Sequence, residues 1–252
     1  MKYLLEISYL GTAYHGFQAQ DNAETVQRVL TEAAGRLFNS VCAVTGSSRT
    51  DAGVHARGFC VTLEPKAPYS NVRTENIPRA LCALLPEDIG VVSAREVPED
   101  FHPRYSALGK EYEYLIHTGS CRDPFLVGRA WMHPMRLDED AASAMSAAAE
   151  HIVGRHDFTS FMAAGSDIKD PVRTVGCCRV SRDGLLLRIN ISADGFLYNM
   201  VRIIAGTLVA VGEGKLSPQD VADIIAARDR SRAGVTAPPD GLYLNRVFYP
   251  DV

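Results

Sequence analysis

The feature that most constrains the fold is the alternation of short strand patterns with amphipathic helix patterns along the chain. Residues 2–9 place apolar side chains on one side, as a half-buried strand does. The first part of the chain is expected to contain strands at 2–9, 41–44, 59–63 and 89–97 and helices at 24–38 and 74–84. This order, with a loop between the second and third strands, indicates an α+β unit with a mixed or antiparallel sheet. Asp21 or Asn22 is the expected N-cap of the first helix.

The second part of the chain repeats a loosely similar order of patterns. Its expected strands lie at 110–116, 172–181 and 185–192 with a last strand near the C-terminus, and its expected helices at 138–153, 196–211 and from Ser217. Asp183-Gly184 favours a hairpin between two of these strands, and Gly154 is the expected C-cap of the alanine-rich helix. Residues 156–161 are expected to form a loop.

A charged connector bounded by prolines at residues 98–104 predicts a domain boundary. The expected domains are 1–104 and 105–252. The fold class is therefore α+β, with two related domains of mixed or antiparallel sheet, helices on one face of each sheet and an active-site cleft between the domains.

Composition is that of an ordinary globular protein. The 252 residues are 46% hydrophobic and 22% charged, and no apolar stretch approaches the roughly 20 residues that cross a bilayer. The N-terminus has no signal-peptide core, so we expect a cytoplasmic protein. Six cysteines without Cys-x-x-Cys spacing and seven histidines without ligand spacing imply no metal. The net charge of −4 argues mildly against a nucleic-acid partner, although the placement of charge matters more than its sum.

A polar, glycine-bounded segment at residues 46–56 separates two apolar strand patterns and is therefore a turn at a sheet end. Asp51 in this turn lies two residues from Arg49 and beside the small Ala52. An arginine within about 4–6 Å would hold the carboxylate ionised near neutral pH. A charged carboxylate on a rigid turn suits a nucleophile or base, while an ordinary turn would use the same aspartate as a backbone cap.

The run Arg-Thr-Asp-Ala-Gly-Val-His-Ala at residues 49–56 resembles the signature of the TruA family of tRNA pseudouridine synthases, in which the aspartate is catalytic. One position departs from the family pattern, because Ser48 stands where the family usually has glycine. Residues 11–18 also resemble a family element. Leu10 and Phe17 there replace the family's aspartate and tryptophan, so no catalytic role is assigned to that element.

Further motifs follow in the family order over nearly the whole chain. Residues 101–107 resemble the motif that leads into the second domain, and residues 156–161 resemble another element. Tyr112, the first tyrosine of a Tyr-x-Tyr pair, matches the family's active-site tyrosine. Residues 196–202 resemble the helix whose arginine, here Arg202, joins the active site. Residues 237–244, with Leu242, resemble a segment that lines the family's pocket.

The resemblance implies an isomerase that converts uridine to pseudouridine on the 3′ side of the tRNA anticodon arm, as a homodimer and without metal or cofactor. The implied catalytic residues are Asp51, Tyr112, Arg49 and Arg202, with Tyr112, Arg57, His55 and Leu242 binding substrate. The resemblance implies that Asp51 would attack the ribose or the base or remove a ribose proton, and that Arg49 or Arg202 would pair with it. Tyr112 packs on the base and removes the C5 proton.

Two other classes of protein compete with this interpretation. A non-catalytic RNA-binding module of RRM-like topology would not need Asp51 on a glycine-bounded turn, nor the arginine and tyrosine motifs of the second half. A glycoside hydrolase also places a carboxylate beside a glycosidic bond, but that chemistry usually needs two carboxylates and the motifs supply one. Release of tritium from C5-labelled uridine in tRNA would distinguish all three.

Overall fold

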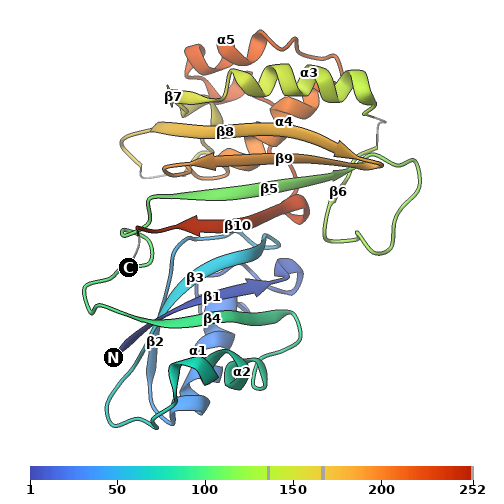
Figure 1. The fold of residues 1–252 in the computed structure, drawn as a ribbon. Coiled ribbons are helices and arrows are strands. Elements are labelled where there is room, and N and C mark those ends of the chain that lie inside the picture. The colour runs from blue at the N-terminus through green and yellow to red at the C-terminus, as the bar shows by residue number, and fades with distance from the viewer. Residues whose placement is uncertain (135–136, 166–167, 251–252) are drawn as a thin grey trace. The chain divides into compact units, whose positions relative to one another are not determined.

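The computed structural model describes residues 1–134, 137–165 and 168–250, and these form two compact units (Figure 1). The first unit comprises residues 1–108 together with 243–252, and the second comprises residues 109–242. Both combine strands and helices, so the α+β class is confirmed.

The first unit holds a mixed sheet, antiparallel except for one parallel pair, with two helices on one face. Its strands are β1 (Lys2–Tyr9), β2 (Cys42–Gly46), β3 (His55–Pro65), β4 (Ile89–Val97) and β10 (Leu242–Phe248), and its helices are α1 (Val26–Phe38) and α2 (Ile77–Cys82). Short 3₁₀ turns at Gly11–Ala13 and Thr74–Asn76 complete it. β1 lies between β4 and β3 and is antiparallel to both. The other edge of β3 pairs with β2 at one end and, in parallel, with β10 at the other.

Alternation along β1 decides which face of this sheet is buried. Tyr3, Leu5, Ile7 and Tyr9 are all buried, and the ring of Tyr3 stacks on Phe38 of α1 at 5.8 Å between centroids. The two helices contact each other and cover this face. The hydrophobic face predicted for residues 2–9 is therefore the face that packs on the helices.

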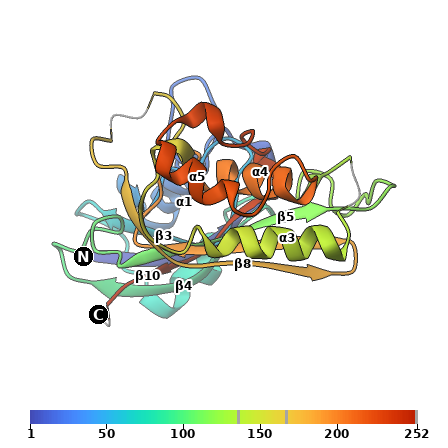
Figure 2. The same cartoon turned by 90° about the horizontal axis from the view of Figure 1, so that it is seen from above.

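In the second unit, β5, β9, β8 and β7 are successive antiparallel neighbours and β6 is parallel to β5. Its strands are β5 (Gly109–His117), β6 (Trp131–Met132), β7 (Gly154–Asp157), β8 (Val172–Asp183) and β9 (Leu186–Ala193), and its helices are α3 (Glu139–Glu150), α4 (Met200–Gly212) and α5 (Asp220–Ala227). Three 3₁₀ turns lie at Thr159–Phe161, Arg230–Arg232 and Pro239–Gly241. Helix α3 runs alongside β8 and contacts α4 (Figures 1 and 2).

Register explains the core of the second unit. Tyr112, Tyr114 and Ile116 of β5 lie opposite Ile191, Ile189 and Leu187 of β9, and all six are buried. Helix α4 is buried along most of its length and packs against β5. The predicted hairpin is present, with Gly184 at a φ of +59° between β8 and β9.

Two helix ends differ from the sequence prediction, because a capping side chain or a backbone angle sets the end at another residue. Neither Asp21 nor Asn22 caps α1; the hydroxyl of Thr25 accepts the N–H of Arg28 instead. Gly154 does not cap α3, which ends at Glu150 with His151 as its C-cap. Gly154, with a φ of +117°, is instead the first residue of β7. Residues 156–161, expected as a loop, instead contain the end of β7 and a 3₁₀ turn.

The remaining helix starts lie later than predicted. Helix α4 begins at Met200 instead of residue 196, because Asn199 adopts a left-handed φ of +58°. Ser217 binds the carboxylate of Asp220 in a turn, and α5 starts at Asp220. Residues 74–84 divide into a 3₁₀ turn followed by the shorter α2.

The compact units differ from the predicted division into 1–104 and 105–252. The boundary lies after residue 108, and the C-terminal strand belongs largely to the first unit. The physical reason is that β10 pairs with β3, with Tyr243 opposite His55. Pairing between strands so far apart in sequence leaves no local signal. Among the described residues, no helix is both long and apolar enough to cross a membrane.

The corrected N-cap generates a stability prediction. Thr25→Ala is expected to lower the free energy of unfolding by about 1–2 kcal/mol, because α1 loses its cap, whereas Thr25→Ser keeps the hydroxyl and most of the stability. The matched controls are Asp21→Ala and Asn22→Ala, expected to stay within about 0.5 kcal/mol of the parent. Urea unfolding followed by circular dichroism measures all four, and equal losses in the threonine and control variants would contradict the assignment.

Candidate functional site

The turn that carries Asp51 connects β2 to β3, and both of its ends are tied to the sheet. The N–H of Ser47 donates to the carbonyl of Cys60 at 2.9 Å, and the Ser47 side chain is buried. The hydroxyls of Thr50 and Tyr9 are 2.8 Å apart and hydrogen-bonded within the core. The two residues that flank the exposed part of the turn are therefore fixed by neighbouring strands.

A second segment, residues 11–17, packs directly on this turn. The N–H of Phe17 donates to the carbonyl of Thr50 at 3.2 Å, and the N–H of Gly53 donates to the carbonyl of Tyr14 at 3.2 Å. A Cβ on Gly16 would lie 2.4 Å from the Thr50 oxygen, and one on Gly11 would lie 2.0 Å from the Val54 oxygen. Only glycine permits this approach, since real Cβ atoms do not come so close to backbone.

Asp51 itself is half-buried and closes the turn, because its carbonyl accepts the N–H of Val54 at 3.2 Å. Gly53 completes the turn with a φ of +80°. Ser48, which replaces the family glycine, is not in the left-handed region, so a serine is accommodated there without backbone strain. The Asp51 carboxylate thus stands on a backbone held from two sides.

His55 supports the turn from beneath. Its side chain is fully buried, and its Nδ1 accepts the N–H of Gly11 at 2.9 Å, which places the ring proton on Nε2. The ring stacks on Tyr243 of β10 at 4.6 Å. Since the ring has no exposed surface, its burial favours a positioning role over direct contact with a ligand.

Arg57 and Arg49 are both exposed. The guanidinium of Arg57 lies 4.3 Å from the ring centroid of Tyr243, and its Nη1 donates to Oδ1 of Asn245 at 2.9 Å. These contacts hold a cation at the surface near the buried His55. Arg49 lines a hollow beside the turn together with Ser48.

The second unit holds the other predicted catalytic residues. Tyr112 on β5 is 7% exposed, and its ring meets Phe196 edge to face at 5.0 Å. The side chain of Tyr112 is therefore buried beside the segment that precedes α4. Phe196 lies in the segment that precedes α4, and α4 carries Arg202.

Arg202 is fixed by its own helix start and by a downstream segment. Its Nε donates to the carbonyl of Ala237 at 2.7 Å, and Nη1 donates to Oδ1 of Asn199 at 3.0 Å. The backbone N–H of Ala237 in turn donates a hydrogen bond to the backbone carbonyl of Arg202 at 3.1 Å. The guanidinium plane is therefore oriented before any ligand binds.

The segment from 234 to 242 is itself closely packed in the second unit. A Cβ on Gly206 of α4 would lie 2.0 Å from the Val235 oxygen, and Tyr114 donates its hydroxyl to the carbonyl of Pro238 at 2.7 Å. Burial raises the pKa of Tyr114, and the nearby Arg202 cation partly opposes that rise. Leu242, at the end of this segment, is 6% exposed.

The predicted site residues thus divide between the units. Arg49, Asp51, His55 and Arg57 lie in or beside one turn of the first unit, while Tyr112, Arg202 and Leu242 lie in the second. Sequence reasoning missed Asn199 and Tyr243, which hold Arg202, His55 and Arg57. Asn199 lies in residues 196–202, which resemble a family helix, and this resemblance was the sequence signal that could have identified it. Among the described residues, no group of three or more histidine, cysteine or carboxylate side chains could hold a metal ion.

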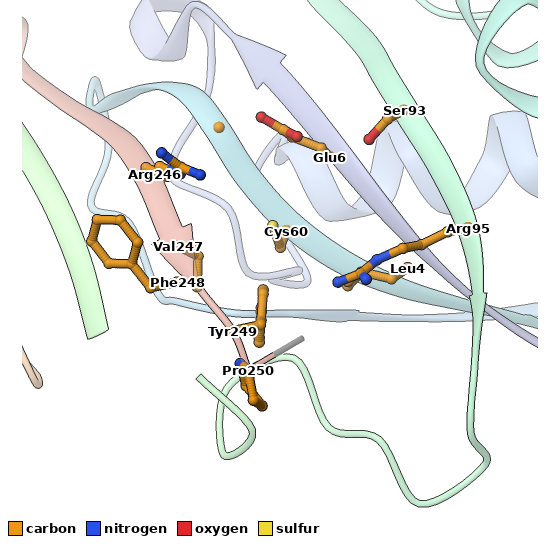
Figure 3. A pocket seen from close by; sticks show the side chains of 11 residues that line it. Leu4, Glu6, Cys60, Ser93, Arg95, Arg246, Val247, Phe248, Tyr249 and Pro250 are labelled. Atoms are coloured by element: carbon orange, nitrogen blue, oxygen red, sulfur yellow. The ribbon is translucent and has the colours of Figure 1, made fainter. Parts of the chain in front are cut away.

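A separate hollow of about 580 Å³ lies on the open face of the first unit's sheet (Figure 3). Glu6 of β1 stands there with Arg246 of β10 on one side and Arg95 of β4 on the other. Cys60 in its wall is buried, and this burial raises the pKa of its thiol to about 12. No predicted catalytic residue lines this hollow, and its charges are mixed.

Comparisons with known proteins identify the family of the chain. A protein from Syntrophomonas wolfei called tRNA pseudouridine synthase A is 46% identical over 100% of this chain and 98% of its own length. A Bacillus pumilus protein of the same name is 44% identical over 99% of both chains. A solved Cbf5-Nop10-Gar1 complex contains a chain that is 14% identical with a TM-score of 0.39, covering 98% of this chain and 50% of that one, and this likeness is too weak to carry an argument. The family model described as tRNA pseudouridine synthase matches residues 7–106 and 148–250, and the chain therefore belongs to the tRNA pseudouridine synthase family.

Proposed function

We propose that this protein isomerises uridine to pseudouridine in tRNA, on the 3′ side of the anticodon arm, with Asp51 as its central catalytic residue. The observation that carries the proposal is the half-buried Asp51 on a turn held by residues 11–17 and by β3. A reacting group must be held within a fraction of an ångström of its productive position. The backbone bonds and glycine contacts around this turn supply that constraint.

The reaction is redox-neutral, and its atoms balance within the substrate. The bond between N1 of uracil and C1′ of ribose breaks, the base turns within the pocket, and a bond forms between C5 and C1′. C5 then loses its proton and N1 gains one. Asp51 serves as the nucleophile or base that starts this sequence, and no cofactor is required.

Tyr112 and Arg202 supply the remaining chemistry in this proposal. Tyr112 packs on the uracil ring and takes the C5 proton, a step that general-base catalysis accelerates by about 10²- to 10⁴-fold. Arg202 is oriented by Ala237 and Asn199, which suits a cation that must pair with a carboxylate or phosphate in one fixed geometry. Arg49 is the alternative partner of Asp51.

The target uridine must leave its stacked position to reach Asp51, at a cost of a few kcal/mol. Contacts to the rest of the anticodon arm offset this cost, with Arg57 as one candidate and Leu242 lining the base pocket. The family resemblance implies a homodimer that works in the cytoplasm, where tRNA is found. A sizing measurement of the free protein tests the dimer, and a fully active monomer would exclude it.

The two rival classes lose support from the site and the family. An RNA-binding module has no use for a closely held carboxylate together with an oriented arginine. A glycoside hydrolase would use a second carboxylate, whereas the motifs of this family provide one. Membership of an isomerase family favours base–ribose isomerisation over both.

The first test replaces the carboxylate. Asp51→Asn is expected to reduce tritium release from C5-labelled tRNA by more than about 10³-fold, because the nucleophile or base is lost. Affinity for tRNA and the unfolding midpoint should stay close to the parent values. The control is Asp21→Asn, an exposed carboxylate that should leave turnover unchanged. Retained turnover in Asp51→Asn would exclude the catalytic assignment.

A second test separates the ring of Tyr112 from its hydroxyl. Tyr112→Phe is expected to bind tRNA normally and to turn over at least about 10²-fold more slowly, since the proton acceptor is missing. Tyr112→Ala should lose affinity as well, because the stacking surface is gone. Single-turnover tritium release and filter binding measure the two effects. Normal turnover in Tyr112→Phe would leave the residue only as a platform for the base.

A third test concerns the support of the catalytic turn. Gly16→Ala places a Cβ 2.4 Å from the Thr50 oxygen at a φ of +87°, so the turn must move. Gly214→Ala is the matched control, because Gly214 has a φ of +72° and nothing within 4 Å of the added Cβ. Both variants carry backbone strain of about 1–3 kcal/mol, but only Gly16→Ala should lose turnover by 10-fold or more at saturating tRNA. Equal turnover in the two variants would show that catalysis does not depend on this packing.

A further inference from the structure

A second hollow, of about 210 Å³, lies in the first unit beside the catalytic turn. Its walls come from the start of α1, the end of β2, the turn itself and the connector after β4. The lining residues are Phe17, Gln18, Gln27, Thr45, Gly46, Ser48, Arg49, His102, Arg104 and Tyr105. Three of these belong to residues 101–107, a motif to which the catalytic proposal gives no role.

The hollow is basic in a protein that is acidic overall. Arg49 and Arg104 line it, and none of its lining residues is an aspartate or glutamate. The chain as a whole has a net charge of −4, and the larger hollow on the same unit contains Glu6 between its arginines. This concentration of positive charge favours an anionic ligand.

Tyr105 offers an aromatic surface at the edge of the hollow. It is 77% exposed, and its ring lies 4.3 Å from the ring of His102. The guanidinium of Arg104 is 5.9 Å from the centroid of the Tyr105 ring. An exposed aromatic ring supported by a second ring and flanked by a cation is the combination that binds single-stranded nucleic acid.

The turn that presents Tyr105 is held rigidly. Nδ1 of His102 accepts the backbone N–H groups of Arg104 and Tyr105 at 3.1 and 3.4 Å, so the ring proton is on Nε2, which is a donor. The N–H of Ser106 donates to the carbonyl of His102 at 2.9 Å. These bonds fix the backbone on both sides of the exposed ring.

The segment before this turn is tied to the sheet. Phe101 is buried against Tyr249, with 5.3 Å between the ring centroids, and the Tyr249 hydroxyl donates to the carbonyl of Pro103 at 2.6 Å. Nζ of Lys2 donates to the carbonyl of Phe101 at 3.1 Å. Tyr105 and Arg104 therefore stand on an anchored scaffold, which lowers the entropy lost when a ligand binds.

We propose that this hollow binds a nucleotide that neighbours the target uridine on the same tRNA strand. Tyr105 stacks on its base, Arg104 and Arg49 contact its phosphate groups, and His102 donates a hydrogen bond from Nε2. The proposal rests on the proposed function, since it assumes that tRNA is the substrate. It gives the motif at 101–107 a role in binding the RNA.

The covalent connection between Arg49 and Asp51 limits how far this nucleotide lies from the reacting one. Two residues of chain span at most about 7 Å between Cα atoms. Arg49 and Asp51 therefore project from the same short stretch of backbone, which favours the target's own strand over a distant part of the tRNA.

The test measures binding of unmodified tRNA across a salt series. Arg104→Ala is expected to weaken binding about 10-fold and to reduce the slope of log K against log salt by about 0.7–0.9, because one phosphate contact is lost. Tyr105→Ala should weaken binding about 10-fold with the slope unchanged, since a stacking ring releases no counterion. Tyr105→Trp should restore affinity.

Two control variants remove the same types of side chain at positions away from the hollow. Arg36→Ala removes one exposed arginine from the same unit, and nine residues of α1 place it about 13 Å along the helix from Gln27. Phe125→Ala removes an aromatic ring that is 81% exposed in the second unit. Both should bind tRNA like the parent protein. The targeted side chains are exposed, so all variants should fold, and circular dichroism checks this.

Tritium release by the parent protein separates the two proposals. Without release from the parent protein, the proposed function fails independently of the hollow. With release, parent-like binding by both Arg104→Ala and Tyr105→Ala would overturn the nucleotide subsite alone. A salt slope unchanged in Arg104→Ala would overturn its phosphate contact, and a loss of affinity that Tyr105→Trp does not restore would overturn the stacking.

Discussion

The close packing of residues 11–17 on the Asp51 turn is the constraint on which the position of Asp51 in the first unit depends. Two glycines let one backbone approach another to a distance that any side chain would prevent. Backbone hydrogen bonds then join the two segments, and the buried His55 ties the first of them to β3. A polar, exposed turn, which would otherwise be mobile, becomes as well defined as the strands on either side of it.

The second unit reaches the same result by different means. Arg202 is held by a side chain one turn away and by a carbonyl 35 residues downstream. The downstream segment stays close to α4 because Gly206 and Gly234 permit backbone contact there. A long cation that could adopt many rotamers is thereby limited to one orientation, which is the preorganisation that electrostatic catalysis requires.

Sequence patterns predicted what is local and missed what is distant. The strand at Ile89–Val97 was predicted with its observed bounds, and the buried face of β1 followed from alternation, because alternation reports which neighbouring side chains are buried. The pairing of β10 with β3 and the stacking of Tyr243 on His55 join residues that are nearly 190 positions apart, and no local pattern records such contacts. Helix starts moved where Asn199 took a left-handed angle or where Thr25 supplied the cap, since single hydrogen bonds and angles decide those ends.

The placement of charge completes the account of how an acidic protein can bind RNA. Debye screening at physiological salt limits the reach of an exposed charge to about 8 Å, so the net charge of the whole chain has little influence on a phosphate within a hollow. The electrostatic potential at such a phosphate is set by the nearby arginines, because no carboxylate is among the residues that line the hollow. Acidic residues elsewhere act over longer distances, where screening removes most of their effect. The acidic residues elsewhere therefore do not offset the local attraction between the arginines of the hollow and a phosphate.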